Sequence, residues 1–515
     1  MTGTAHPHAF ARARGDGQPV LDDQVIARAR RPRNVTTRIF RWLPVAIIPI
    51  TGLVVFAQLN TPISDPDTFW HLRLGKHLQD SWRFVGSEPW SSFADRPLVL
   101  HEWSPELVYV AVHHVAGWAG LSYLQAFGAL ALLVTLYVCT RQFSAPLVAS
   151  LTAIAALAGA SDSVALRPQV ISFILLAVFT TAWLRTFDDG RARWWLIPLA
   201  WVWACSHGMW FVGVGVGAAV VLGMLVDRRL SWRAASRLAA IPVGGLLAAA
   251  LTPVGTQLLA SPVGMRGYTR FISEWRTPSP FMLQVMITLG IAIALVVIWT
   301  RTRTRPFWTD LILMGIGVVC TLAYARTIAL GAIILALLAA RALNGVVPVG
   351  ADRQLEKGKE VAVVGLGVAL VCLVGAWTSR VDVSQPADVP FAFNSILDAL
   401  PADAVVFNEY ELGGWLLWEH PSLDPVIDGR ADVYTVAHFD EIAGAYDLLP
   451  GWEATVRDSG ASAAVLKEGT SLPEALARYL GWRRVSSDEG YVLLMPPGRE
   501  RPGGAGSPAT LLTPP

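Results

Sequence analysis

The chain has 515 residues, of which 53% are hydrophobic and only 16% are charged. A soluble domain carries about 25% charged residues, so this composition excludes an ordinary soluble protein and predicts a membrane protein. The formal net charge is only +2, and the basic residues gather in particular loops. That pattern indicates membrane orientation rather than nucleic-acid binding.

The first 42 residues are polar and rich in arginine, and they predict a disordered basic tail on the cytoplasmic side. From residue 43 to residue 380, long runs free of Asp, Glu, Lys and Arg alternate with short polar loops. A spanning helix needs about 20 mostly apolar residues, and about eleven spans fit these runs. Two runs are predicted to be hairpins that turn near His207 and near Arg326. The run 107–140 is predicted to be an interfacial helix followed by one span.

A different pattern begins at about Val383, where short apolar strands alternate with helical segments. It predicts a small α/β domain over residues 383–498. An odd number of spans precedes this domain, so it is expected on the extracytoplasmic side. Residues 499–515 predict a second disordered tail. The strands are expected at Ala404–Phe407, Ala463–Leu466 and Tyr491–Met495, and the helices at Leu412–Glu419, His438–Leu448 and Leu472–Leu480.

The first outer loop, residues 60–103, contains the acidic pair Asp65 and Asp67 around one proline. Proline favours an extended conformation in the residue before it, and residues i and i+2 of an extended segment point the same way. Both carboxylates are therefore predicted to face one pocket. They could take the proton of an acceptor hydroxyl or hold a divalent cation. The alternative is that Asp67 or Thr68 caps a helix over Phe69–Leu78.

Histidines and a glutamate accompany this pair. His71 follows Asp67 by four residues, on the same face of the expected helix, and His101 and Glu102 close the loop. A histidine in such a place is more often a hydrogen-bonded structural group than a ligand. His207 and Arg326 lie between apolar halves, where an ionisable side chain is costly and is by default a functional candidate.

Arginine can bind a phosphate because the guanidinium matches its oxygens bidentately. Arg266, Arg270 and Arg326 are candidates for this role, although snorkelling toward lipid headgroups is the ordinary use of an interfacial arginine. Arg167 and Glu274 are further ionisable residues expected in the outer loops. Trp70 suits contact with a sugar ring, or else belongs to the aromatic belt of the membrane interface.

Several motifs of the chain resemble those of a set of bacterial multi-pass membrane proteins. These proteins are similar to the GT-C glycosyltransferases, which include protein O-mannosyltransferases, aminoarabinose transferases and oligosaccharyltransferase catalytic subunits. The resemblance covers nearly the whole chain. It rests on Asp65-Pro66-Asp67-Thr68-Phe69-Trp70-His71-Leu72-Arg73-Leu74-Gly75, His101-Glu102-Trp103, Ser206-His207-Gly208, Glu274-Trp275, Asn408-Glu409-Tyr410-Glu411-Leu412-Gly413-Gly414 and Asp428-Gly429-Arg430-Ala431-Asp432.

This resemblance implies a mostly helical membrane protein that uses a polyprenyl-phosphate-linked sugar on the outer face of the bilayer. It implies that Asp67 is the loop acid that engages the acceptor and that an arginine holds the donor phosphate. Some GT-C enzymes use Mg²⁺ or Mn²⁺, and Asp65 and Asp67 would then be the expected ligands. The acceptor, whether a glycan, a lipid or a protein, is left open.

The resulting hypothesis is an inverting glycosyl transfer. Asp67 is expected to act as the base, with support from Asp65, His71, His101 and Glu102. Arg266, Arg270 or Arg326 would stabilise the phosphate leaving group, and His207, Glu274 and Trp70 would line the cavity. Two alternatives belong to other classes. One is a transporter or flippase of lipid-linked sugars, and the other is a non-enzymatic envelope scaffold.

Overall fold

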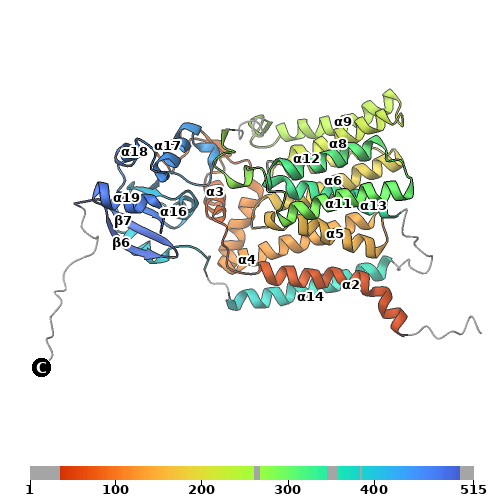
Figure 1. Cartoon of the computed structure of the whole chain (residues 1–515), viewed down its shortest axis with the longest axis horizontal. Coiled ribbons are helices and arrows are strands. Elements are labelled where there is room, and N and C mark those ends of the chain that lie inside the picture. The colour runs from red at the N-terminus through yellow and green to blue at the C-terminus, as the bar shows by residue number, and fades with distance from the viewer. Residues whose placement is uncertain (1–34, 260–266, 345–356, 383–384, 499–515) are drawn as a thin grey trace, which may run out of the picture. The chain divides into compact units, whose positions relative to one another are not determined.

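The computed structural model describes residues 35–259, 267–344, 357–382 and 385–498 (Figure 1). The chain divides into two compact units, residues 1–44 and 45–515. The described part of the first unit is the start of α2 (Val35–Leu59), which begins inside the segment predicted to be a disordered tail. Arginine is a good helix former, so the helix extends into this basic segment beyond its apolar run. Residues 1–34 lie outside the described part.

Seven helices in the described part are long and apolar enough to cross a membrane, if the short 3-10 turns η1 (Ser161–Ser163) and η4 (Ala325–Thr327) are counted with their neighbours. They make the chain a multi-pass membrane protein. The seven are α2, α4 (Trp103–Arg141), α5 (Pro146–Ala160), α6 (Gln169–Asp189), α11 (Leu283–Thr302), α13 (Ile328–Asn344) and α14 (Lys357–Asp382).

Four of the described helices between α6 and α13 are shorter or more polar than these seven, and the predicted count of about eleven spans is not confirmed. At 1.5 Å per residue, the nine residues of α7 (Leu196–Ala204) cannot cross a bilayer. The helix α9 (Trp232–Ala250) begins with Arg233 and Arg237. The two remaining apolar helices are α8 (Trp210–Val226) and α12 (Trp308–Ala323).

The expected breaks between helices are present. Inside α4, Gly117 has φ 58° and ψ −151°, a conformation open to glycine but not to other residues, and it separates the expected interfacial helix from the span. His207 lies in the turn between α7 and α8, and Arg326 lies in η4 between α12 and α13. Both ionisable side chains therefore sit at turns between apolar helices, as predicted.

The segment 60–103, which was predicted to be the first outer loop and keeps that name below, folds into the helix α3 (Asp67–Ser81) and a two-stranded antiparallel sheet, β1 (Val85–Gly86) and β2 (Leu98–Val99). The helix α3 packs closely against the start of α4. A Cβ atom on Gly75 would lie 2.4 Å from the carbonyl oxygen of Glu106, so only glycine permits this approach.

The C-terminal part contains a five-stranded sheet in the order β4-β3-β5-β7-β6. Parallel pairing joins β4, β3 and β5, and antiparallel pairing joins β5, β7 and β6. The three predicted strands are present as β3 (Val405–Asn408), β5 (Ala463–Lys467) and β7 (Tyr491–Met495). The prediction missed β4 (Asp424–Pro425) and β6 (Arg483–Asp488). The strand β4 has only two residues, and β6 is an edge strand whose mostly polar sequence lacks an apolar pattern.

The helices of this part cover both faces of the sheet, and the predicted ones are present within two residues at each end. The domain boundary near residue 383 stays a prediction, and residues 499–515 lie outside the described part. The helices are α15 (Asn394–Leu397), α16 (Gly413–Glu419), α17 (Val436–Tyr446), α18 (Trp452–Asp458) and α19 (Ser471–Leu480), with short 3-10 turns at η6 (Phe391–Phe393), η7 (Tyr410–Leu412) and η8 (Ala431–Val433).

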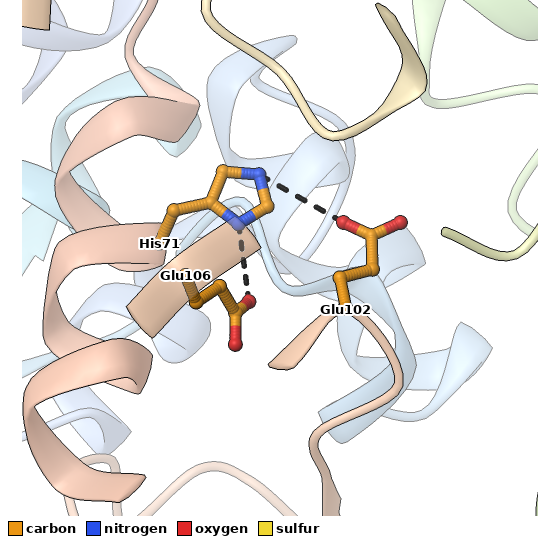
Figure 2. A group of neighbouring side chains, drawn as sticks. All are labelled: His71, Glu102 and Glu106. Atoms are coloured by element: carbon orange, nitrogen blue, oxygen red, sulfur yellow. Dashed lines mark hydrogen bonds and ion pairs between the residues drawn. The ribbon is translucent and has the colours of Figure 1, made fainter. Parts of the chain in front are cut away.

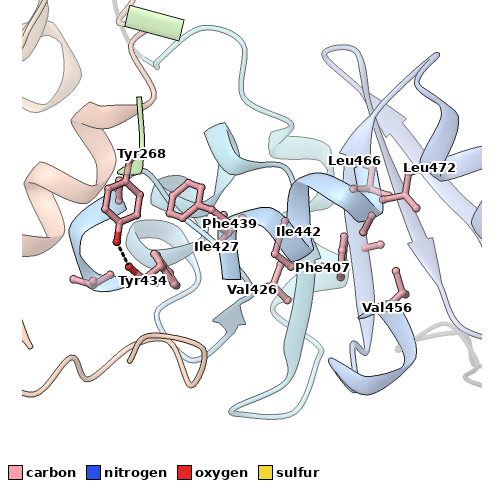
Figure 3. Close-up of a cluster of buried hydrophobic side chains, with 14 of the residues drawn as sticks. Tyr268, Phe407, Val426, Ile427, Tyr434, Phe439, Ile442, Val456, Leu466 and Leu472 are labelled. Carbon is pink, nitrogen blue, oxygen red and sulfur yellow. Dashed lines mark hydrogen bonds between the residues drawn. The ribbon is translucent and has the colours of Figure 1, made fainter. Parts of the chain in front are cut away.

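One hydrophobic core joins the outer loops to this sheet (Figure 3). It contains Leu74 of α3, Leu98 of β2 and Phe407 of β3, all buried. Tyr268, which precedes the 3-10 turn η3 (Ser273–Trp275), donates a hydrogen bond of 2.7 Å to the carbonyl of Tyr434. The first outer loop is therefore packed as part of the C-terminal region rather than as a separate excursion of the chain.

Candidate active site

The guanidinium of Arg167, which lies just before α6, joins three carboxylates. It donates to both oxygens of Asp65, forms an ion pair of 3.1 Å with Asp67 and donates to Glu274. Burial alone would lower the pKa of Arg167, but the carboxylates of Asp67 and Asp65 outweigh burial and raise the pKa. Arg167 was expected in an outer loop, but its role as the centre of the cluster was not predicted.

The acidic pair points toward one place, as predicted, but for a different reason. The intervening Pro66 is helical, with φ −65° and ψ −23°, so the pair meets Arg167 from the start of α3, with Asp67 as its first residue and Asp65 just before it, rather than from an extended strand. Asp65 accepts a hydrogen bond of 3.1 Å from the backbone amide of Asp67. The predicted capping of the helix by Asp67 or Thr68 is wrong, because α3 begins at Asp67 and its N-cap Pro66 has no side-chain cap. The carboxylate of Asp67 therefore stays available in the cluster.

Asp67 is held from two further sides. The indole nitrogen Nε1 of Trp70 donates a hydrogen bond of 2.9 Å to Oδ1 of Asp67. A Cβ atom on Gly429 would lie 2.8 Å from the same oxygen. The C-terminal domain therefore covers this carboxylate with the backbone of a glycine, where a side chain would not fit. Burial is the main cause that raises the pKa of Asp67 above its ordinary value, although Arg167 opposes it.

The hydrogen bonds around His207 define its tautomer. Its Nδ1 accepts from the backbone amide of Met209 at 3.3 Å and lies 2.8 Å from the hydroxyl of Ser172. Burial lowers the pKa of His207 well below its ordinary value, so the ring is neutral and the proton resides on Nε2. That nitrogen lies 3.3 Å from Oε1 of Glu102 and 3.4 Å from Nη2 of Arg326.

Arg326 closes a chain of contacts that begins at Asp67. Its Nη1 lies 3.4 Å from Oε2 of Glu274, whose other oxygen meets Arg167. The guanidinium also lies 5.7 Å from the centre of the Trp275 ring. Asp67, Arg167, Glu274 and Arg326 are therefore linked in one continuous network, with His207 beside it, although the five residues come from five separate segments of the chain.

A second group surrounds His71 (Figure 2). Its Nδ1 lies 3.1 Å from Oε1 of Glu106, and its Nε2 lies 3.9 Å from Oε2 of Glu102, so the ring stands between two carboxylates. All three side chains are buried. Ligand atoms of the three residues lie within 4.8 Å of one another, a spacing that could hold a divalent cation.

The donor set fits such a cation. Imidazole and carboxylate suit Mn²⁺ and related ions, and a carboxylate that accepts the other ring N–H is the usual orienting partner of a histidine ligand. Glu106 can play that orienting part toward His71. Its Oε2 is buried and has no hydrogen-bond partner among the described residues. Asp65 and Asp67, the expected metal ligands, both pair with Arg167, and their role as metal ligands stays a prediction.

His101 links this group to the C-terminal domain. Its Nδ1 lies 3.1 Å from the carbonyl of Val99, and the ring lies 3.8 Å from both Glu102 and Asp432. Burial would lower the pKa of His101, but these two carboxylates outweigh burial and raise the pKa. Glu106 and Asp432 were not predicted as site residues. Glu106 lies directly before the apolar run 107–140, and Asp432, although part of a quoted motif, lies 331 positions beyond His101 in the chain.

One of the predicted phosphate-binding arginines, Arg270, lies away from the network. Arg270 forms an exposed ion pair of 2.5 Å with Asp440. Arg266 lies outside the described residues. Of the three candidates, Arg326 alone among the described residues contacts the cluster.

A cavity of about 180 Å³ adjoins the network. Glu274 and Arg326 form part of its wall, together with Asp162, Ser163, Gln169 and Gln284. Its lining comes from the ends of α5, α6, α11 and α13, so it opens where the apolar helices end.

Solved structures with the same arrangement of elements include the archaeal oligosaccharyltransferase AglB from Archaeoglobus fulgidus, in complex with an inhibitory peptide and a dolichol-phosphate. It matches with 11% identity and a TM-score of 0.53 over 86% of this chain and 73% of that chain. ArnT from Cupriavidus metallidurans bound to undecaprenyl phosphate matches with 15% identity and a TM-score of 0.50 over 89% and 98% of the two chains. ArnT in the apo state gives 16% identity and a TM-score of 0.51 over 88% and 97%.

The chain has the GT-C glycosyltransferase fold. This confirms the fold that the sequence motifs predicted. No protein-family profile matches the sequence, and no curated protein does. At these identities the GT-C likeness establishes the fold alone, and the roles of the site residues stay predictions.

Proposed function

We propose that this GT-C protein is a membrane glycosyltransferase that moves a sugar from a polyprenyl-phosphate donor to an acceptor on the extracytoplasmic face. The observation that carries the proposal is the single network in which a carboxylate, Asp67, and a guanidinium, Arg326, are joined through Arg167 and Glu274. Glycosyl transfer from a phosphate needs these two kinds of group, a base for the acceptor and a cation for the leaving group.

Asp67 is the proposed base. Its carboxylate is partly exposed, whereas the neighbouring Asp65 is nearly buried. The raised pKa of Asp67 brings the group closer to neutral pH, where a general base works best. The indole of Trp70 and the backbone of Gly429 fix its orientation.

Arg326 is the proposed phosphate ligand. A guanidinium has five N–H donors, and the contacts of Arg326 with Glu274 and His207 are both long, at 3.4 Å. Arg167, by contrast, uses its donors on three carboxylates. AglB and ArnT were solved with a dolichol-phosphate and with undecaprenyl phosphate, which supports a lipid-linked donor here.

The proposed reaction is a displacement with inversion. The acceptor oxygen forms a bond to the anomeric carbon while the bond from that carbon to the phosphate oxygen breaks. Its electron pair leaves with the phosphate, beside Arg326, and Asp67 takes the acceptor proton. A divalent cation held by His71 and Glu102 would add positive charge to a cluster rich in carboxylates.

The test is the substitution Asp67→Asn in the full-length protein. A general base contributes about 10²- to 10⁴-fold, so transfer of labelled sugar from undecaprenyl-phosphate donors in native membranes should fall by at least about 100-fold. Asp80→Asn is the matched control, because Asp80 is exposed and forms a surface i,i+4 ion pair with Lys76. Undiminished transfer by the Asp67→Asn protein would refute the proposal. Movement of the intact donor across the membrane of reconstituted vesicles, without cleavage of its sugar–phosphate bond, would favour the alternative of a transporter or flippase.

A further inference from the structure

The cavity beside Arg326 is polar where it meets the network. Arg326 and Glu274 belong to its wall, and Gln169 and Ser163 are also lining residues. A phosphate bound to Arg326 would place its substituent at this wall. The residues that line the cavity would therefore contact the group attached to that phosphate, and their chemistry indicates which groups can bind there.

Gln169 presents an unsatisfied acceptor. Its side chain is 97% buried, and its Nε2 donates a hydrogen bond of 2.8 Å to the carbonyl of Ser163. Because a carbonyl only accepts, this bond also defines which end of the amide is oxygen. The oxygen Oε1 is buried and has no hydrogen-bond partner in the part of the chain that the structure describes. A buried acceptor without a partner is costly, and a ligand hydroxyl or amine would satisfy it.

The charges of the lining exclude an acidic ligand. The lining holds two carboxylates, those of Asp162 and Glu274, and among its described residues one guanidinium, that of Arg326. Glu274 is already within 3.4 Å of Arg326, and the phosphate would take the remaining donors of that guanidinium. A carboxylate on the ligand would meet like charge without a counter-ion, whereas a hydroxyl or an ammonium group would not.

The cavity is also small. Its volume of about 180 Å³ is below the range of about 300–1,000 Å³ that is typical of pockets for larger ligands. It can take one ring, and not a chain of sugars.

From these observations we infer that the cavity is the subsite for the donor sugar, and that it selects a single neutral or amino monosaccharide over a uronic acid. Gln169 is the specificity-determining residue that accepts a hydrogen bond from the sugar. The inference rests on the proposed function, since it requires a sugar phosphate at Arg326.

The experiment measures binding alone, so it does not depend on catalysis or on the acceptor. The full-length protein in lipid nanodiscs is titrated with undecaprenyl phosphate and with its glucose, glucosamine and glucuronic acid derivatives. The neutral and amino donors should bind about 10-fold more tightly than the sugar-free lipid, as expected for one or two additional hydrogen bonds. The glucuronic acid donor should bind no more tightly than the sugar-free lipid.

Two variants test separately the hydrogen bond from the sugar to Gln169 and the repulsion of an acidic sugar by Asp162. Gln169→Leu should remove the advantage of the neutral donor and leave binding of sugar-free undecaprenyl phosphate unchanged, which also shows that the variant is folded. Asp162→Asn, at the exposed rim, should improve binding of the glucuronic acid donor and leave the glucose donor unchanged. Equal binding of acidic and neutral donors, or an undiminished neutral-donor advantage in Gln169→Leu, would overturn the inference. Transfer activity lost in Asp67→Asn would still support the proposed function.

Discussion

At the scale of single residues, the arrangement of charge explains how several acids coexist in one site. Asp65, Asp67 and Glu274 surround a single guanidinium, that of Arg167. Buried charges are stable only when they are paired. The uneven exposure of the three carboxylates, with Asp65 nearly buried, leaves Asp67 and Glu274 as the members that can meet a substrate.

The raised pKa of Asp67 predicts the pH dependence of transfer. A base must be ionised, so the rate should fall as the pH falls through the pKa of Asp67, and burial puts that pKa above the ordinary 3.8. The acidic limb of a profile of kcat/KM against pH should therefore lie above 3.8 and should be unchanged in Asp80→Asn. A limb at or below 3.8 would show that Asp67 is not the group that titrates.

At the scale of elements, the close packing of α3 on α4 brings the histidine group together. Gly75 follows His71 by one turn on the same face of α3, and it contacts the backbone of Glu106, the partner of His71. The contact between two helices and the contact between two ionisable side chains therefore depend on the same approach.

Gly75→Ala should separate the two helices. A Cβ atom there would lie 2.4 Å from backbone that cannot move aside cheaply, and overpacking of this kind costs about 1–3 kcal/mol. A lower midpoint of thermal unfolding and reduced transfer are expected. Gly86→Ala is the control, because a Cβ atom at Gly86 meets nothing within 4 Å. Equal midpoints for the two variants would contradict this account.

At the scale of the whole molecule, a buried ion-pair network attaches the first outer loop to the C-terminal domain. Arg430 pairs with Asp428 at 2.6 Å and with Glu88 of the loop at 2.7 Å, and the exposed fractions of these side chains are 2% or less. The hydroxyl of Tyr434 donates to Asp428 at 2.5 Å. The C-terminal domain is thus part of the architecture that positions Asp67, rather than an appendage.

Arg430→Met should loosen both regions together, because it leaves two buried carboxylates without their partner. Removing one member of a buried pair costs about 3–5 kcal/mol. Hydrogen exchange should increase both in residues 82–102 and in the C-terminal domain. Arg457→Met is the control, since Arg457 forms an exposed i,i+4 pair with Glu453, and such pairs contribute about 0–1 kcal/mol. Faster exchange confined to one region would show that the two are not coupled.

The local pattern of residues was sufficient to predict much of the secondary structure. Runs of apolar residues predicted the long helices, and the periodicity after residue 383 predicted β3, β5 and β7, because these features depend on neighbouring residues only. The glycine break in α4 followed from the length of one run. The number of spans could not be predicted from the sequence in the same way, since a short helix such as α7 has the same apolar composition as a spanning helix.

The residue pattern alone was enough to show that the chain is a membrane protein and that an acidic pair and several histidines lie together in residues 60–103. Three contacts became visible only in the folded chain: Arg167 joins the acids, Glu106 faces His71 and Gly429 covers Asp67. The physical reason is distance along the chain. Burial and pairing of ionisable groups are set by packing between segments that can lie more than 300 residues apart, and no local pattern encodes which of them meet.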